Sequence, residues 1–384
     1  MTKRTRLSVV MPVYNAEQYL EAALASVFAQ TVSDFELVVV EDGSSDSTVD
    51  ILNRCSDPRL RVVVNEKNVG VTESLNRGLA AATGSIIARH DADDLSHPER
   101  FAKQLALLDE QPDVAAVGSA SELIDANDQH ITNWQYPETT AECRWRAMFN
   151  SPVSHPAAMF RRDAALDAGG YSDDHPHAED YDLWCRLLQA GHNLANLPDR
   201  LIRYRVHAQA VSTTKQRAQE ETRCRIAIAQ ARTVSSDIPE DLFRRIIGLD
   251  KLTPETARPA LQLLAGLRRD FYATQQLTRE EMSRIDNLVV LRATDVFQSV
   301  PLGARLRFLI SHRELIPASY YLTGGVLRMI VSSSVKDRVK RQLGIPIDRV
   351  CRDTTDVPEE ATEPSHPTAA VAHDELCKSP TNIA

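Results

Sequence analysis

The sequence has few cysteines, and none of them belongs to a recognisable metal or redox pattern. There are six in 384 residues, and no two form a Cys-x-x-Cys pair. Zinc sites and disulfide scaffolds depend on such clusters. We therefore expect neither, and the cysteine usage fits a reducing cytosol. The cysteines are Cys55, Cys143, Cys185, Cys224, Cys351 and Cys377.

Long apolar runs are also absent. No window approaches the roughly 20 apolar residues of a transmembrane helix, and the run at residues 7–13 is too short for a secretory signal. The best candidate, residues 316–332, contains an arginine and two glycines. We interpret it as an amphipathic helix packed on the protein. The neighbouring Arg338, Lys340 and Arg341 leave peripheral membrane contact open. We expect a cytoplasmic protein, with the inner face of the membrane as the alternative position.

An excess of positive charge is missing as well. The formal net charge is -9 at pH 7, which argues against a nucleic-acid binder that works by neutralising phosphates. With 43% hydrophobic and 25% charged residues, the composition is that of an ordinary globular protein. The length allows one large domain and a smaller addition.

Strand and helix patterns alternate along the N-terminal part. Continuous apolar runs predict strands buried on both faces, and apolar residues three or four apart predict the helices between them. Such alternation favours a parallel sheet. We therefore predict an α/β fold with a Rossmann-like, mostly parallel sheet flanked by helices. Strands are expected at residues 7–13, 35–40, 60–64, 85–90, 114–118 and 157–160, and helices at residues 16–30, 47–54, 72–83, 99–108, 163–168 and 179–190.

The composition changes after residue 215. Residues 216–350 are rich in Arg, Glu, Ala and Leu, and we predict a helical C-terminal region there. Residues 351–384 are rich in Pro, Thr, Glu, Ala and Ser and have almost no large apolar side chains. Such a segment cannot bury enough surface to fold, so we expect a disordered tail. The α/β domain accordingly covers residues 1–215.

Three acidic residues, Asp91, Asp93 and Asp94, directly follow the fourth expected strand. Two carboxylates one residue apart can share a hard divalent cation, which keeps water and substrate phosphates as its other ligands. The alternative is a turn cap with solvated acids, because aspartate is common in turns. The first two strands also end in polar segments, at Tyr14 and Asp42, and ligands bind outside the carboxyl ends of such sheets. The sequence therefore favours one crevice at which these strand ends converge.

Eight short motifs follow one another along the first 215 residues. They are VVMPVYN (9–15), VVEDGSSD (39–46), NVG (68–70), DADD (91–94), NSPVSHP (150–156), GGY (169–171), AEDYDLW (178–184) and YRVH (204–207). This ordered set resembles the inverting family 2 glycosyltransferases, which have the A-type nucleotide-diphospho-sugar transferase fold. Each motif alone is weak, whereas the order of all of them is a strong signal. The resemblance implies that residues 1–215 are the catalytic domain.

The resemblance implies a nucleotide-diphospho-sugar donor bound at the strand ends. Asp42 would accept an N–H of the base, and Tyr14 could stack on it. The alternative for Tyr14 is a half-buried loop aromatic, and for Arg77 it is a solvated helix residue. The substrate-binding residues so implied are Pro12, Tyr14, Glu17, Asp42, Asn68, Gly70, Arg77, Asp91, His155 and Glu179.

The resemblance also implies a metal at the DADD motif. Asp91, Asp93 and His207 would hold Mg²⁺ or Mn²⁺, which would neutralise the diphosphate as it leaves. For His207 the alternative is a loop histidine with a structural hydrogen bond. We expect His90 to be a core residue and not a ligand, and Asp94 to cap the turn that follows.

Asp180 is the general base that the resemblance implies. It would take a proton from the acceptor hydroxyl during a direct, inverting displacement. The alternative is that acids in the first turn of a helix are favoured by its dipole. His155 would line the acceptor side, and Trp184 is expected in the core. The acceptor would be a glycan or a lipid-linked molecule, in the synthesis of a cell-surface polysaccharide or glycoconjugate.

Two other functions compete with glycosyl transfer. A nucleotidyltransferase would share the fold type and a carboxylate-bound metal. It usually carries a basic, glycine-rich N-terminal loop for a triphosphate, and residues 11–15 offer none. An inactive sugar-nucleotide-binding protein or scaffold is the second alternative, and the intact carboxylates argue against it.

Overall fold

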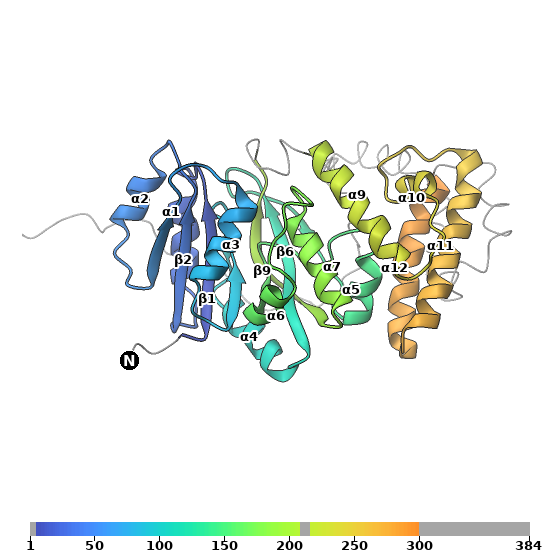
Figure 1. Ribbon diagram of the computed structural model, residues 1–384, viewed down its shortest axis with the longest axis horizontal. Helices are drawn as coiled ribbons and strands as arrows, with labels where there is room; N and C mark the ends of the chain where they lie inside the picture. Colours follow the sequence, from blue (N-terminus) through green and yellow to red (C-terminus); the bar gives the residue numbers. More distant parts are fainter. Residues whose placement is uncertain (1–4, 208–215, 299–384) are drawn as a thin grey trace, which may run out of the picture. The chain divides into compact units, whose positions relative to one another are not determined.

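The computed structural model of the chain describes residues 5–207 and 216–298 (Figure 1). Within them, nine strands join into one sheet in the order β3-β2-β1-β4-β8-β6-β9-β5, with β7 paired to β6. The strands are β1 (Leu7–Val13), β2 (Phe35–Glu41), β3 (Leu60–Val64), β4 (Ile86–Arg89), β5 (Leu95–Ser96), β6 (Val114–Ile124), β7 (His130–Trp134), β8 (Met159–Arg161) and β9 (Asn193–Arg205).

Helices connect these strands and continue beyond them. Local sequence explains some of their starts: at α5, Thr139 and Glu142 form a capping box that satisfies free backbone N–H groups. The helices are α1 (Leu20–Phe28), α2 (Thr48–Arg54), α3 (Val71–Ala81), α4 (Arg100–Glu110), α5 (Thr140–Arg146), α6 (Arg162–Asp167), α7 (Glu179–Gln189), α9 (Gln216–Arg232), α10 (Glu240–Ile246), α11 (Pro254–Thr274) and α12 (Arg279–Gln298).

The first four strands form the parallel part of the sheet, as the sequence predicted. β1 is central, with Val10 opposite Val38 of β2 on one side and Arg89 of β4 on the other. The carboxyl ends of β1, β2 and β4 therefore lie at one edge, because parallel strands run in the same direction. The α/β fold with a Rossmann-like sheet is confirmed in this part.

The rest of the sheet is mixed, which qualifies the expectation of a mostly parallel sheet. β8 is antiparallel to β4 and to β6, while β6 and β9 are parallel. The short strand β5 is antiparallel to β9. The antiparallel β8 joins the two parallel groups. Because β5 pairs with β9, the end of β9 lies beside the segment that follows β4.

Alternating side chains of β1 pack into two cores on opposite faces of the sheet. Val9 and Met11 lie in a cluster with apolar residues of α1, α2 and α4. Val10 lies in a second cluster with Leu75 and Leu79 of α3, which Figure 1 shows crossing β1 and β2. Burial on both faces explains why β1 and β2 read as continuous apolar runs.

The C-terminal region is helical as far as the structure describes it, with α9 to α12 at residues 216–298. The predicted amphipathic stretch at 316–332 and the predicted tail at 351–384 lie outside the described residues. None of the helices that the structure describes is long and apolar enough to cross a membrane. Most of the long strand β9 was not predicted: only its end at Tyr204 and Arg205 is strand-like in the sequence, and β7 and α5 were not predicted either.

Candidate functional site

Three carboxylates directly follow β4, and we call Asp91, Asp93 and Asp94 the acid cluster. One oxygen of each lies within 4.8 Å of the others. β4 is buried along its length, so these acids leave the sheet at the edge where its parallel strands end. Oxygen ligands this close together are the donor set that a hard divalent cation takes.

Cationic and N–H groups from two strands surround the acid cluster. Arg89 forms an ion pair with Asp91. His207, just after β9, has its Nε2 atom 2.8 Å from Oδ2 of Asp93. The backbone N–H of Arg205 donates to Oδ1 of Asp94 at 2.8 Å. The end of β9 therefore closes over the segment that follows β4, and it brings His207 to a predicted metal ligand.

Burial changes the acidity of the cluster. It raises the pKa of Asp91, against the opposing charge of Arg89. It raises the pKa of Asp94 well above its ordinary value, and the charges of Asp93 and Asp91 add to this effect. Oδ2 of Asp94 is buried and has no hydrogen-bond partner among the described residues. Clustered carboxylates of this kind are stabilised as anions by a bound cation.

Two predictions beside the acid cluster have different outcomes. Asp94 was expected to cap the next turn, and this was wrong: it is 1% exposed and accepts the backbone N–H of Arg205 next to the β5–β9 pair. Asp94 therefore joins β4 to β9. His90 is fully buried, its Nδ1 lies 2.6 Å from the carbonyl oxygen of Asp91, and burial lowers its pKa to about 3. The core position predicted for His90 is confirmed.

Asp42 lies at the end of β2 and holds the loop that precedes α3. Its Oδ1 accepts the N–H of Val69 at 2.8 Å, and its Oδ2 accepts the N–H of Gly70 at 3.0 Å. The side chain of Asn65 also donates to Oδ1 at 2.8 Å. Gly70 has φ 91°, which other residues rarely adopt. The structure thus brings Asp42 and Gly70 together, with Asp42 buried.

The other residues predicted for the donor lie around this loop and the end of β1. Arg77 of α3 donates to Oδ1 of Asn65 at 2.6 Å and to Glu73 at 2.7 Å, so it is connected to the Asp42 network. Pro12 is partly buried on β1, whereas Tyr14 is 50% exposed and Asn68 is exposed.

Glu17 ties the loop after β1 to the loop after β2. Its N–H donates to Oδ2 of Asp46 at 3.1 Å, and its own Oε2 accepts the N–H of Ser47 at 2.9 Å. Oδ1 of Asp46 also accepts the N–H of Thr48, the first residue of α2, at 3.0 Å.

Glu179 and Asp180 open α7, and we call them the acid pair. Burial raises the pKa of Glu179 to about 7, and the negative charge of Asp180 contributes. Oε2 of Glu179 is buried without a hydrogen-bond partner in the part of the chain that is described. Burial also raises the pKa of Asp180, while Arg223 and Arg89 oppose this shift. A carboxylate with a raised pKa is a stronger base once it is ionised.

His155 contacts neither the acid cluster nor His207 through any bond the structure describes. Its Nε2 lies 2.9 Å from the hydroxyl of Tyr171, and burial lowers its pKa well below the ordinary range. Its ring packs edge-on against Trp184, which is fully buried, as the sequence predicted. His155 is therefore a neutral residue beside the acid pair's helix.

Sequence reasoning did not assign a role to Arg205, although it lies in the YRVH motif. Its Nε donates to the carbonyl oxygen of Asp93 at 2.8 Å. Its guanidinium pairs with Asp128 at 2.8 Å and lies 4.4 Å from the ring centroid of Tyr19. That ring in turn packs against His207, with centroids 5.2 Å apart. Arg205 therefore fixes both Asp93 and the surroundings of His207.

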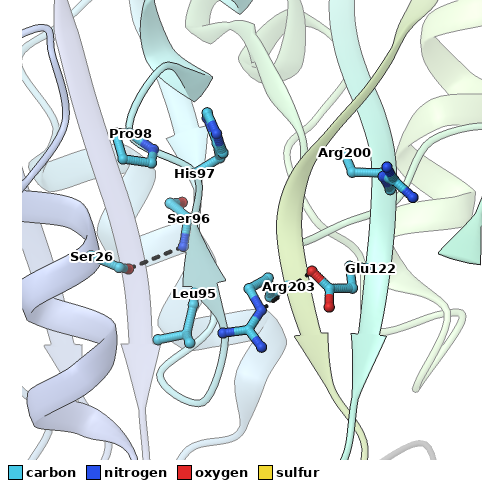
Figure 2. Close-up of a pocket in the computed structure, with 8 residues that line it drawn as sticks. All are labelled: Ser26, Leu95, Ser96, His97, Pro98, Glu122, Arg200 and Arg203. Carbon is cyan, nitrogen blue, oxygen red and sulfur yellow. Dashed lines mark hydrogen bonds and ion pairs between the residues drawn. The ribbon is translucent and has the colours of Figure 1, made fainter. Parts of the chain in front are cut away.

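A cavity of about 310 Å³ lies between α1, β5 and the β6–β9 pair (Figure 2). Inside it, Arg203 Nε lies 3.3 Å from Oε2 of Glu122. The predicted site residues are not among those that line it, so we assign it no part in the site. The lining residues are Ser26, Leu95, Ser96, His97, Pro98, Glu122, Arg200 and Arg203.

Comparison with known proteins gives consistent matches. The model of the family described as Glycosyl transferase family 2 matches residues 8–168. The chain is 35% identical over 209 residues to the amylovoran biosynthesis glycosyltransferase AmsE of Erwinia amylovora, covering 53% of this chain and 78% of AmsE. It is 33% identical over 205 residues to the O-antigen biosynthesis glycosyltransferase WbnJ of Escherichia coli, covering 52% and 80%.

A solved structure is similar in fold. It is S. aureus TarS 1–349 in complex with UDP-GlcNAc, which matches with a TM-score of 0.50 and 18% identity over 88% of this chain and 92% of that one. At such low identity the match supports the fold alone.

Proposed function

The chain belongs to glycosyl transferase family 2 and is a glycosyltransferase, and from this premise we propose a specific reaction. The enzyme transfers a sugar from a nucleotide-diphospho-sugar to an acceptor hydroxyl and inverts the anomeric configuration. The observation that carries the proposal is the meeting of the acid cluster with His207, whose Nε2 lies 2.8 Å from Asp93. This meeting occurs at the sheet edge where ligands of α/β proteins bind.

The residues at this edge fit a divalent cation. Asp91 and Asp93 offer carboxylate oxygens, His207 offers an imidazole nitrogen, and the crowded oxygens of the acid cluster lie within 4.8 Å. Carboxylate oxygens are the protein ligands that Mg²⁺ and Mn²⁺ take. When bound, the cation neutralises charge on the diphosphate leaving group. Arg205 supports these ligands by holding the backbone of Asp93.

The nucleoside would lie over the loops that follow β1, β2 and β3. Asp42 supports this proposal because its buried carboxylate fixes the Gly70 loop by two N–H bonds. It accepts a third bond from Asn65, which leaves one lone pair, on Oδ2, for a base N–H. Tyr14 is 50% exposed at the end of β1 and is available to stack. Pro12, Glu17, Asn68 and Arg77 complete this part of the proposal.

Asp180 is the proposed base. It takes the proton of the acceptor hydroxyl as that oxygen attacks the anomeric carbon from the side opposite the diphosphate. The raised pKa of Asp180 makes its ionised form a better proton acceptor. Glu179 would contact the substrate beside it, and His155 would line the acceptor side.

The relatives indicate the kind of product. AmsE is named for amylovoran biosynthesis and WbnJ for O-antigen biosynthesis. We propose that this enzyme likewise extends a cell-surface polysaccharide or glycoconjugate, on a glycan or lipid-linked acceptor. It would work in the cytoplasm or at the inner face of the membrane.

A donor screen tests the proposal. The purified chain is heated with UDP-sugars and GDP-sugars, each with and without Mn²⁺, because a carboxylate at Asp42 could accept an N–H of either base. A specific donor should raise the melting temperature in the presence of Mn²⁺ and release its nucleoside diphosphate, since a ligand that binds only the folded state stabilises it. Stabilisation by nucleoside triphosphates, with no effect of any nucleotide-sugar, would favour a nucleotidyltransferase. Donor binding without turnover on any acceptor, water included, would favour an inactive binding protein.

A further inference from the structure

Helix α9 comes after the catalytic domain in sequence but packs against α7, which carries the acid pair. Its buried residues Ile226 and Ala227 belong to the same core cluster as Trp184 of α7. Two polar contacts fix it further. Gln219 donates to the carbonyl oxygen of His177 at 2.9 Å, just before α7, and Gln189 at the end of α7 donates to Gln230 at 3.0 Å.

Arg223 lies one turn after Gln219 on α9. Its guanidinium donates to the side-chain oxygen of Asn150, which opens the motif NSPVSHP. The same oxygen accepts the N–H of Ser151 at 2.8 Å, and the carbonyl oxygen of Ser151 accepts Nε of Arg146 at 3.0 Å. The loop at residues 150–151 is therefore held between an arginine of α5 and an arginine of α9.

We infer that Arg223 is a positioning residue for sugar transfer: it holds the Asn150 loop and places a fixed positive charge beside Asp180. This inference rests on the proposed function, with Asp180 as the base. It gives the helical region after residue 215 a part in the active site. The matched family model ends at residue 168, so this part belongs to a region that the model does not cover.

The charges around Asp180 show what Arg223 contributes. Burial raises the pKa of Asp180, and Arg223 is the first of two cations that oppose it, with Arg89 the second. Arg89 is already paired with Asp91, whereas Arg223 donates to the neutral Asn150. The titratable and charged groups that face Asp180 are Glu179 and Cys185 of α7, Arg89 of β4, Tyr136 after β7, Tyr171 after α6 and Arg223 of α9.

The sign of the effect follows from this arrangement. Asp180 must be ionised to accept a proton. Without the charge at residue 223, Arg89 and backbone hydrogen bonds at the start of α7 still oppose burial, but one of the two opposing cations is lost, so the pKa of Asp180 rises further. As the pH is lowered, the rate of transfer should therefore begin to fall at a higher pH than in the wild type. At high pH Asp180 is ionised in both proteins, so the loss of the charge should change the rate there only a little.

The test uses the full chain and the nucleotide-sugar that the donor screen selects, with water as the acceptor and release of nucleoside diphosphate as the readout. The pH profile is recorded from about pH 5 to about pH 9 for the wild type and its variants. Arg223→Gln should move the acid limb upward by roughly one pH unit, as expected for loss of a nearby opposite charge. Arg223→Lys should restore most of the wild-type profile. Gln is chosen because it can still donate to Asn150.

Arg225→Gln is the matched control. Arg225 is exposed on the same helix and donates to Thr222 of its own turn at 3.2 Å, so its loss should leave the profile unchanged.

An unchanged profile in Arg223→Gln, with an active wild type, overturns the role of Arg223 and leaves the proposed function intact. If Arg225→Gln moves the acid limb by the same amount, the role of Arg223 is overturned as well, because the shift would then be a long-range charge effect. Absence of turnover by the wild type with every donor overturns the proposed function itself. If Arg223→Gln does not fold, Arg223→Met replaces it: an upward shift of the acid limb supports the role of the charge, and an unchanged acid limb overturns it.

Discussion

The acid cluster after β4 and the acid pair at the start of α7 are both groups of adjacent carboxylates, but their surroundings differ. Each member of the cluster meets a cation or an N–H donor from another residue: Arg89 at Asp91, His207 at Asp93 and Arg205 at Asp94. For the acid pair, the described residues include no ion pair and no hydrogen bond from the side chain of another residue. Both groups hold a buried oxygen without a hydrogen-bond partner among the described residues, Oδ2 of Asp94 and Oε2 of Glu179, and burial raises the pKa of both residues, that of Glu179 to about 7.

This difference suits two kinds of chemistry. Oxygens that are close together and held in place by second contacts form a site for a cation, since such contacts orient the ligands. A buried carboxylate whose charge is only partly compensated retains affinity for a proton, which is what a base needs. In the proposed function, the two groups of carboxylates would therefore serve different roles, with Arg89 and the end of β9 supplying the partners of the acid cluster. The predictions below test this contrast.

Removal of a ligand from the acid cluster should have the largest effect. Asp93→Ala removes both a carboxylate and the partner of His207, so the cation should bind poorly and the diphosphate should lose its counter-charge. Such stabilisation amounts to several kcal/mol, so kcat/KM should fall by roughly 10³-fold or more. Calorimetry with Mn²⁺ should show weakened binding. Unchanged Mn²⁺ affinity in this variant would place the cation elsewhere.

Asp180→Asn should have the next largest effect. It keeps the shape of the side chain and removes the base, so kcat should fall by roughly 10²- to 10³-fold, within the usual range for general-base assistance. In contrast to Asp93→Ala, the affinity for Mn²⁺ and the donor should stay near the wild-type value. Full transfer activity in Asp180→Asn would remove the base assignment.

Glu179→Gln should reveal the incomplete compensation of the acid pair as a gain in stability. The folded-state pKa of Glu179 is about 7, against 4.5 as its ordinary value. Between these pH values the folded state binds more protons than the unfolded state, so the wild type loses stability as pH rises and the full loss is present above pH 7. Glutamine does not titrate. The variant should therefore be more stable than the wild type at pH 8 by on the order of 2 kcal/mol, and by much less at pH 5, in urea unfolding. If the variant and the wild type differed in stability by the same amount at pH 5 and at pH 8, the raised pKa of Glu179 would be contradicted.

The sequence predicted the parts of this site that depend on local pattern. The four parallel strands were recognisable because their apolar runs are continuous, and the carboxylates were recognisable because they follow directly on β4. The contacts that distinguish the acid cluster from the acid pair could not be recognised in the sequence. β9 contains Asp199, Arg200 and Arg203, so it does not resemble a buried strand, and its pairing with β6 includes register shifts. The position of Arg205 therefore depends on tertiary pairing that no local pattern encodes.

Arg223 shows the same limit in the helical region. Its helix was predicted, yet its contact with Asn150 joins residues 73 positions apart. The face of α9 that meets α7 is set by packing in the shared core cluster, and charged residues on a helix are usually solvated. Only the folded chain reveals which arginine of the helix faces the acid pair.

Arg205→Lys should have the smallest effect of the series, because it leaves every cation ligand in place. The lysine keeps the charge but loses the planar guanidinium that contacts the carbonyl oxygen of Asp93, Asp128 and the ring of Tyr19 at once. Loss of such an orienting contact typically weakens metal affinity by about 10- to 100-fold, and we expect the lower end because the backbone N–H of residue 205 still binds Asp94. Titration with Mn²⁺ should detect the change.

Asp128→Asn is the matched control. Asp128 is 55% exposed, and an exposed ion pair contributes less than about 1 kcal/mol. Asparagine also tolerates the φ of 62° at this position. A loss of affinity in Asp128→Asn as large as that in Arg205→Lys would mean that the turn at residues 125–128, and not the contact with Asp93, orders the acid cluster.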